Sequence, residues 1–180
     1  MIPIYNIIIS PKGDRYNNSE NGIIMNAHID EKDFHFTNRI GVVEKLPLID
    51  TPFEVGDEVI VHHNVFRKYW NFKGKLRTSS NDLDGMFSVY QDQIFAYKRD
   101  SVWITIDEWV FIAPQEASKD TLTLSLDPYT KRVGTVVISK KPNLVGETVG
   151  FTPASEYEFN IDGQKMYKMR ERDITCKIYE

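Results

Sequence analysis

The feature that most constrains this chain is a succession of short apolar runs, each rich in β-branched or aromatic residues and bounded by Gly, Pro, Asp or Asn. No window long enough for a helix, about 11 residues, repeats apolar side chains at positions i, i+3, i+4 and i+7. Short strands at close spacing, with turn residues between them, are typical of barrels and sandwiches. An α/β fold would need a helix-length amphipathic run between parallel strands. The sequence lacks such a run and therefore predicts an all-β protein.

Strands are expected over residues 4–9, 40–43, 58–62, 86–90, 93–98, 102–106, 109–112, 134–138, 148–151, 157–161, 165–170 and 175–179. The polar stretch 10–21 predicts a mobile loop, and residues 73–85 form a second polar insert between expected strands. Residues 115–120 and 127–132 frame a third flexible region. Asp162-Gly163 lies between two expected strands and predicts a tight hairpin with a primed turn.

The composition supports a buried core and limits the classes of function. Of the 180 residues, 41% are hydrophobic, which excludes wholesale disorder. The net charge of −4 argues against a nucleic-acid binder that works through bulk positive charge. A single cysteine, Cys176, excludes an internal disulfide framework and a cysteine-rich zinc module. The apolar run at 7–9 is far too short for a secretory signal or a membrane span, so we expect a soluble cytoplasmic protein.

Two parts of the sequence repeat the same motifs. Residues 40–43 (IGVV) and 133–137 (VGTVV) each contain Gly-x-Val, and residues 55–60 (VGDEVI) and 145–150 (VGETVG) each contain Val-Gly-acid-x-Val. The glycines would relieve strain at turns, the acidic residues would face solvent, and the valines would share one face of a barrel. We therefore expect two small barrels in tandem, over residues 1–107 and 108–180, the first enlarged by an insert at about 62–85.

Several stretches occur in an order that is known from one family. In the second half they are residues 134–137 (GTVV), 145–151 (VGETVGF), 157–159 (YEF), 162–163 (DG) and 167–174 (YKMRERDI). In the first half they are the strand at 4–10, the polar loop to Asn21 and the segment Gly22-Ile23-Ile24-Met25. Together these stretches resemble the GroES-type co-chaperonins, the chaperonin-10 family, with its opening strand, mobile loop, Gly-x-Val and Val-Gly-Asp-x-Val motifs and C-terminal xxMxExDI element.

The resemblance implies two GroES-like β-barrels in tandem and a function that is not enzymatic. Members of the family close rings over a chaperonin chamber, and an apolar tripeptide of the mobile loop docks in a groove of the chaperonin. Gly22, Ile23, Ile24 and Met25 would then bind a GroEL-type chaperonin with its bound nucleotide, and copies of the chain would associate into a ring. In the second half, Leu122, Leu124 and Leu126 would stand in for this segment. The resemblance implies no cofactor and no metal. The composition, rich in Asn, Ile, Lys and Tyr, suits a phage protein, which would be located in the cytoplasm of the host cell.

Residues 62–70 (HHNVFRKYW) have no counterpart in the family. Phe66, Tyr69 and Trp70 alternate with cations, which is typical of a subunit interface and also of a surface that binds single-stranded nucleic acid. The acidic total charge favours the subunit interface. His62 and His63 could suggest a metal site together with His28, His35, Asp57 and Glu58. Neighbours on a strand point to opposite faces, and the resemblance makes Asp57 and Glu58 turn residues, so we expect no metal there.

Two further expectations concern the C-terminal part. Residues 167–173 alternate charged and apolar side chains, which predicts a half-solvated edge strand. Cys176 lies in an expected strand and is predicted to be a core residue. An alternative function for the whole chain is a phage structural or assembly protein, built on a GroES-like barrel without chaperonin binding, because a fold does not fix a function.

Overall fold

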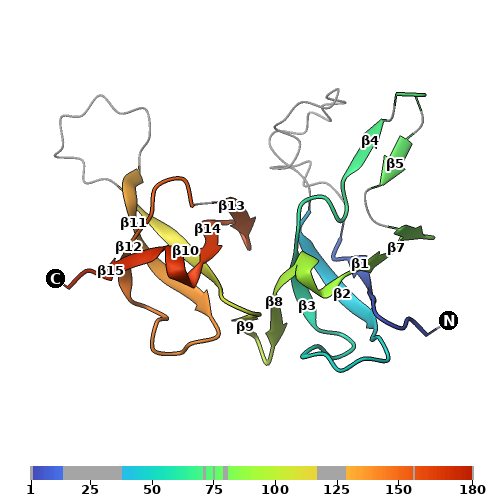
Figure 1. Ribbon diagram of the computed structural model, residues 1–180, viewed down its shortest axis with the longest axis horizontal. Helices are drawn as coiled ribbons and strands as arrows, with labels where there is room; N and C mark the ends of the chain where they lie inside the picture. The colour runs from blue at the N-terminus through green and yellow to red at the C-terminus, as the bar shows by residue number, and fades with distance from the viewer. Residues whose placement is uncertain are drawn as a thin grey trace. The chain divides into compact units, whose positions relative to one another are not determined.

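The computed structural model describes residues 2–13, 38–70, 72–74, 76–78, 81–116, 129–155 and 157–179. The described chain is all-β, as the sequence predicts, with two single-turn 3₁₀-helices as its only helical segments. It divides into two compact units, Met1–Val102 and Trp103–Glu180 (Figure 1). The sequence analysis placed this boundary between residues 107 and 108. Within the described ranges, no helix has the length and apolar character needed to cross a bilayer.

The first unit is built on one antiparallel sheet. Its strands follow the order β6-β7-β1-β2-β3-β8-β9. They are β1 (Ile7–Pro11), β2 (Ile40–Lys45), β3 (Glu58–Val61), β6 (Asn81–Leu83), β7 (Met86–Val89), β8 (Ile94–Arg99) and β9 (Val102–Thr105), and the unit boundary falls within β9. Two further strands, β4 (Lys68–Trp70) and β5 (Leu76–Thr78), pair as a separate two-stranded sheet.

The second unit has a six-stranded antiparallel sheet of order β13-β14-β10-β11-β12-β15. Its strands are β10 (Trp109–Glu116), β11 (Tyr129–Ser139), β12 (Thr148–Phe151), β13 (Tyr157–Ile161), β14 (Gln164–Arg170) and β15 (Ile174–Lys177). The strands β10 and β11 are longer than expected, so residues 115–116 and 129–132, which the sequence analysis assigned to a flexible region, belong to paired strands.

The two units share one topology. Six strands of the first sheet, β6-β7-β1-β2-β3-β8, correspond in sequence order to β13-β14-β10-β11-β12-β15 of the second. Even the irregularities recur. The pairing of β1 with β2 shifts register between Ile8 and Ile9, and that of β10 with β11 shifts between Phe111 and Ile112. Beyond each shift a proline pairs with a glycine, Pro11 with Gly41 and Pro114 with Gly134.

The turn before the third strand is the same in both units. The amide of Gly56 donates to the carbonyl of Val43 at 2.8 Å, and the amide of Gly146 donates to the carbonyl of Val136 at 2.8 Å. Both glycines have a positive φ, 94° and 87°, which residues with a Cβ rarely adopt. The internal repeat predicted from the Gly-x-Val and Val-Gly-acid motifs is therefore present, and it extends over all six strands of the second sheet.

The buried side chains repeat as well. The core of the second unit consists of Val110, Ile112, Val136, Val149, Phe151 and Met169. The strand registers place Ile7, Ile9, Val43, Val59, Val61 and Val89 at the corresponding positions of the first unit, and all six are buried. Alternate residues of a strand face the same side, so each sheet carries a matched set of buried apolar side chains on one face.

The tight turns explain where one prediction succeeded and another failed. Asp162 and Gly163 both have positive φ, 53° and 79°, as a primed hairpin turn requires. This confirms the predicted hairpin between β13 and β14. Asp84 and Gly85 have the same conformation, with φ of 55° and 89°, and join β6 to β7. The polar insert at residues 73–85, in which no strand was expected, therefore contains β5, β6 and this turn.

Candidate functional site

The candidate site is the connection between β1 and β2, in which the apolar segment Gly22, Ile23, Ile24 and Met25 occurs. This segment lies outside the described residues, and the structure describes the two ends at which the connection begins and closes. The amide of Lys12 donates to the carbonyl of Ile40 at 2.8 Å. The side chain of Asn38 bridges the ends, donating to the carbonyl of Lys12 at 2.7 Å and accepting from the amide of Ile40 at 2.9 Å.

These contacts fix the base of the connection to the sheet. Asn38 and Arg39 are buried, with exposed fractions of 6% and 5%. The carbonyl of Arg39 accepts a hydrogen bond from the amide of Val61 in β3 at 2.8 Å. Across the same end of the sheet, the ammonium of Lys12 lies 2.6 Å from a carboxylate oxygen of Glu58. A buried amide side chain with both its donor and its acceptor in use is costly to remove, so Asn38 holds the two chain ends together.

The second unit has an equivalent connection between β10 and β11, and Leu122, Leu124 and Leu126 occur in it. They too lie outside the described residues. The paired strands run up to it, since Glu116 at the end of β10 pairs with Tyr129 at the start of β11. The shared topology thus places the two apolar segments that the sequence analysis selected in corresponding connections of the two units.

The three candidate interface residues have different environments. Phe66 is fully buried in the first unit, where its ring packs edge-on against Phe87 with 5.1 Å between the centroids. Its ring also lies 3.1 Å from the point that a Cβ on Gly41 would occupy. Its ring therefore faces the core of its own unit and is not part of the surface. Tyr69 and Trp70 belong to β4, and their side chains lie outside what the structure describes.

His62 and His63 do not lie as the sequence analysis expected. The strand β3 ends at Val61, and the chain turns after it, so the two imidazole rings lie beside each other with 4.2 Å between their centroids. The argument that they point to opposite faces of a strand is therefore wrong. Nδ1 of His62 accepts a hydrogen bond from the amide of Asn64 at 3.2 Å. Among the residues described here, no group of three or more His, Cys, Asp or Glu side chains could hold a metal ion, and His28 and His35 lie outside them.

An ionic cluster that was not predicted from the sequence lies at the β2–β3 connection. Asp57, expected to face solvent, is buried, and its carboxylate accepts from the guanidinium of Arg99 at 2.7 Å. Arg99 also donates to the carbonyl of Pro52 at 3.1 Å and lies 3.2 Å from Glu54. The hydrogen bond to Asp57 raises the pKa of Arg99 above its ordinary value. This cluster ties the connection to β8, and its role is structural, because the Asp57 carboxylate is occupied by its partners.

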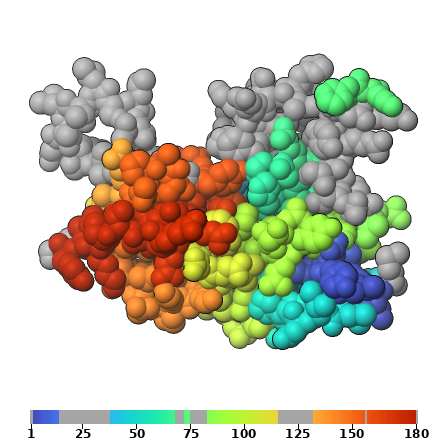
Figure 2. All heavy atoms as spheres, in the orientation of Figure 1, coloured from blue at the N-terminus to red at the C-terminus, as the bar shows by residue number. Residues whose placement is uncertain are grey.

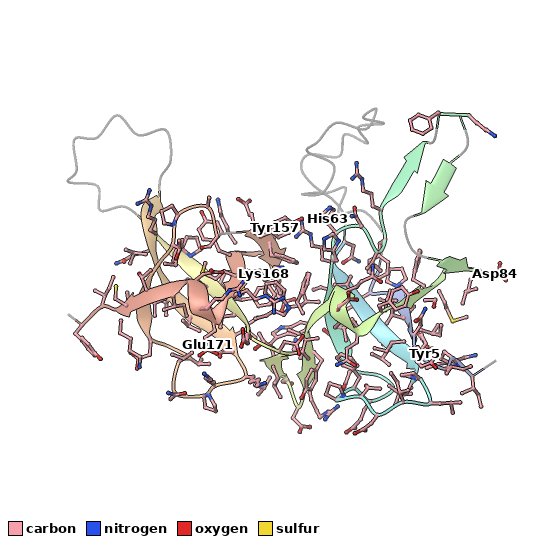
Figure 3. The ribbon with its side chains drawn as sticks, viewed as in Figure 1. Tyr5, His63, Asp84, Tyr157, Lys168 and Glu171 are labelled. Carbon is pink, nitrogen blue, oxygen red and sulfur yellow. The ribbon has the colours of Figure 1, made fainter. Side chains whose placement is uncertain are left out.

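A second missed cluster lies in the second unit. The indole ring of Trp109 lies under the ammonium of Lys168 at 3.7 Å and the guanidinium of Arg170 at 3.6 Å. Lys168 also lies 5.5 Å from the ring centroid of Tyr157 (Figure 3). The predicted edge strand at 167–173 is thus wrong, since β14 lies between β13 and β10 and Lys168 is buried. Strand order, which the local pattern does not reveal, decides which charged residues are covered.

Cys176 is exposed, which corrects the prediction of a core position. It lies in β15, the last strand of the second sheet, which among the described strands pairs with β12 alone.

Compared with known proteins, the chain matches no protein-family model and no curated protein.

Proposed function

We propose that this chain is a co-chaperonin-like ring subunit, which caps a GroEL-type chaperonin with its bound nucleotide and assists protein folding. The two units would be GroES-like barrels in tandem, the first enlarged by the residues between β3 and β6. The observation that carries the proposal is the duplicated strand order, with an apolar segment in the corresponding connection of each unit. The resemblance of the motifs to the co-chaperonin family supports the same function.

The docking mechanism follows from the composition of the first connection. Ile23, Ile24 and Met25 form a short apolar segment within a polar stretch, and a short apolar segment can fill an apolar groove of a partner protein. Ordering such a segment costs conformational entropy, so each contact would be weak and easily released. A ring presents many segments together, and avidity then makes the complex stable.

Self-association is proposed through the edge of the second sheet. The corresponding strand of the first sheet, β8, has β9 on its outer side, whereas β15 is an edge strand. In the chain, β9 leads into β10 as the N-terminal segment leads into β1. The N-terminal segment lies at the surface (Figure 2, blue). Its Ile2, Ile4 and Tyr5 are exposed large apolar residues, as are Ile178 and Tyr179 after β15. We infer that the N-terminal segment of one copy covers β15 of the next, a head-to-tail contact that forms a ring where the rotation between successive copies closes on itself.

The decisive experiment uses size-exclusion chromatography with light scattering, on the full chain alone and mixed with a bacterial chaperonin and ATP. The wild-type chain should form a ring and co-elute with the chaperonin. The variant Ile23→Ser/Ile24→Ser should keep its fold and its ring mass and lose chaperonin binding. Leu48→Ser/Val145→Ser, which changes two exposed aliphatic side chains outside the β1–β2 and β10–β11 connections, is the matched control. Unchanged binding by the Ile23/Ile24 variant would show that residues 22–25 do not dock on the chaperonin.

The second candidate function is a phage structural or assembly protein without chaperonin binding. The exposed β15 edge and the apolar N-terminal segment favour it equally, because both would serve a subunit of any assembly. A defined oligomer that ignores the chaperonin in the same chromatography would support this function. The chain would then be found in mature particles rather than with a chaperonin in lysates of infected cells.

A further inference from the structure

The first unit carries a hairpin arm that the second unit lacks. The arm, residues 67–78, contains β4 and β5, in which Lys68, Tyr69 and Trp70 pair with Thr78, Arg77 and Leu76. In the described residues these two strands pair only with each other and stand apart from the main sheet (Figure 1). A two-stranded hairpin is at best marginally stable in water unless it packs against something else.

The second unit shows that the fold does not need the arm. Between the corresponding strands β12 and β13, only residues 152–156 intervene, whereas β3 and β6 are separated by residues 62–80. An elaboration that occurs in one of two otherwise matched units is not required for the sheet or its core. Loops and arms of this kind commonly carry binding residues on a rigid scaffold.

The arm begins at the same end of the sheet as the β1–β2 connection. Its root, Phe66, packs against Gly41, and Gly41 pairs with Pro11 at the end of β1. The next residue, Lys12, starts the connection in which Ile23 and Ile24 occur. The arm and the β1–β2 connection therefore leave the first sheet at the same end.

Charge and apolar surface indicate what the arm would contact. Residues 67–78 contain five Lys or Arg and no Asp or Glu, whereas the rest of the chain has 17 basic and 26 acidic residues, a net charge of −9. At the turn between β4 and β5, Phe72 is fully exposed and Lys73 is exposed beside it. A basic hairpin with an aromatic tip fits an acidic protein surface that offers an apolar pocket.

We propose that the arm is a second contact to the protein that binds residues 22–25, and that it engages an acidic surface beside the apolar groove. This inference rests on the proposed co-chaperonin function. A protein partner is favoured over nucleic acid, because the remainder of the chain is strongly acidic and would repel an extended polyphosphate. A contact between the basic arm and an acidic patch is local. The acidic remainder of the chain lies farther from that patch, and salt screens its repulsion.

The test measures binding of the full-length chain to a bacterial chaperonin with ATP, at low and at high salt. Lys73→Glu/Lys75→Glu should weaken binding about tenfold at low salt, and less at high salt, because exposed ion pairs are screened. Phe72→Ser should weaken binding about threefold or more at both salt concentrations. Lys45→Glu/Lys140→Glu, with the same change of charge at exposed positions, and Val145→Ser, an exposed aliphatic change, are the controls and should bind as the wild type does.

The outcomes separate this inference from the proposed function. If the wild-type chain and the arm variants bind the chaperonin equally well, the inference is overturned and the proposed co-chaperonin function is unaffected. A wild-type chain that does not bind the chaperonin would overturn both. A changed oligomer mass in the arm variants would make the arm a contact between copies of this chain. Binding of a single-stranded oligonucleotide that depends on Lys73 and Lys75 would make it a nucleic-acid contact, and each of these results would also overturn the inference.

Discussion

Two glycines at corresponding positions of the repeat, Gly41 and Gly134, have different amounts of space around them. A Cβ on Gly134 would overlap the carbonyl oxygen of Ala113 and would lie 2.6 Å from a methyl group of Ile112. On Gly41 the nearest atom, the carbonyl oxygen of Ser10, would be 3.0 Å away. The overlap at Gly134 can be relieved only if β10 and β11 move apart. We expect Gly134→Ala to destabilise the second unit by about 1–3 kcal/mol, and Gly41→Ala to destabilise the first unit by less.

Hydrogen exchange measured by mass spectrometry would test this difference, since peptides from the two sheets report on the two units separately. Gly134→Ala should speed exchange in β10 and β11 and leave β1 and β2 as in the wild type. The variant Gly41→Ala serves as the matched comparison. Equal acceleration by the two variants would show that the close approach of Ala113 to Gly134 does not limit stability.

Single residues were the hardest feature to predict from the sequence. Asp57 was expected to face solvent because it belongs to a Val-Gly-acid turn, and Glu147, its counterpart in the second unit, is indeed partly exposed. The difference is Arg99, which lies 42 residues away in the chain and covers the Asp57 carboxylate. No local pattern links the two residues. Similarly, Phe66 looked like an interface residue from its aromatic and basic neighbours, and only tertiary packing shows it in the core.

Strands were predicted well where alternation and turn residues agreed. The strands β12 and β13 have the predicted bounds, and the Asp162-Gly163 turn joins β13 to β14 as expected. The strands β5 and β6 were missed because three residues are too few to show a period of two, and Ser and Asn surround them. The Asp84-Gly85 turn carried the same hairpin signal as Asp162-Gly163 and could have located β6 and β7 together.

The free edge of β15 allows a test of ring assembly that leaves the unit intact. The amide of Ile178 donates to the carbonyl of Thr148 in β12 at 2.8 Å, so the amides at alternate positions, including Lys177, point away from β12. Proline at an edge position with an outward amide removes only the donor that a second copy would use. We expect Lys177→Pro to shift the protein from ring to monomer in light scattering, with little change in circular dichroism.

Lys177→Ala is the control for this substitution, because Lys177 also lies 3.4 Å from Glu147 in an exposed ion pair. Such pairs contribute on the order of 1 kcal/mol or less, so this variant should still assemble. A ring formed equally well by the proline variant would exclude β15 as the strand that receives the neighbouring copy.

At the scale of the whole molecule, the repeat was visible in two short motifs and proved to include six strands. The order of those strands was not predictable, because β7 pairs with β1 and β3 pairs with β8 across long stretches of chain. Strand order determines whether several residues are buried or exposed. It covers Lys168 on an inner strand and exposes Cys176 on an edge. The docking segments stay a prediction, since residues 22–25 and 122–126 lie outside the described chain.

The duplication makes a last prediction about how many contacts each chain provides. If the second connection adds a weaker contact to the docking of residues 22–25, each copy contributes two apolar segments, and avidity depends on their total number in the ring. Changing Leu122, Leu124 and Leu126 together to Ser should weaken chaperonin binding about tenfold or more without abolishing it, because residues 22–25 remain. Titration with light scattering would measure the loss, and the ring mass should stay that of the wild type. Undiminished binding would mean that only the first unit docks on the chaperonin. The second unit would then contribute only to contacts between subunits of the ring, so that the two copies of the repeat have different functions.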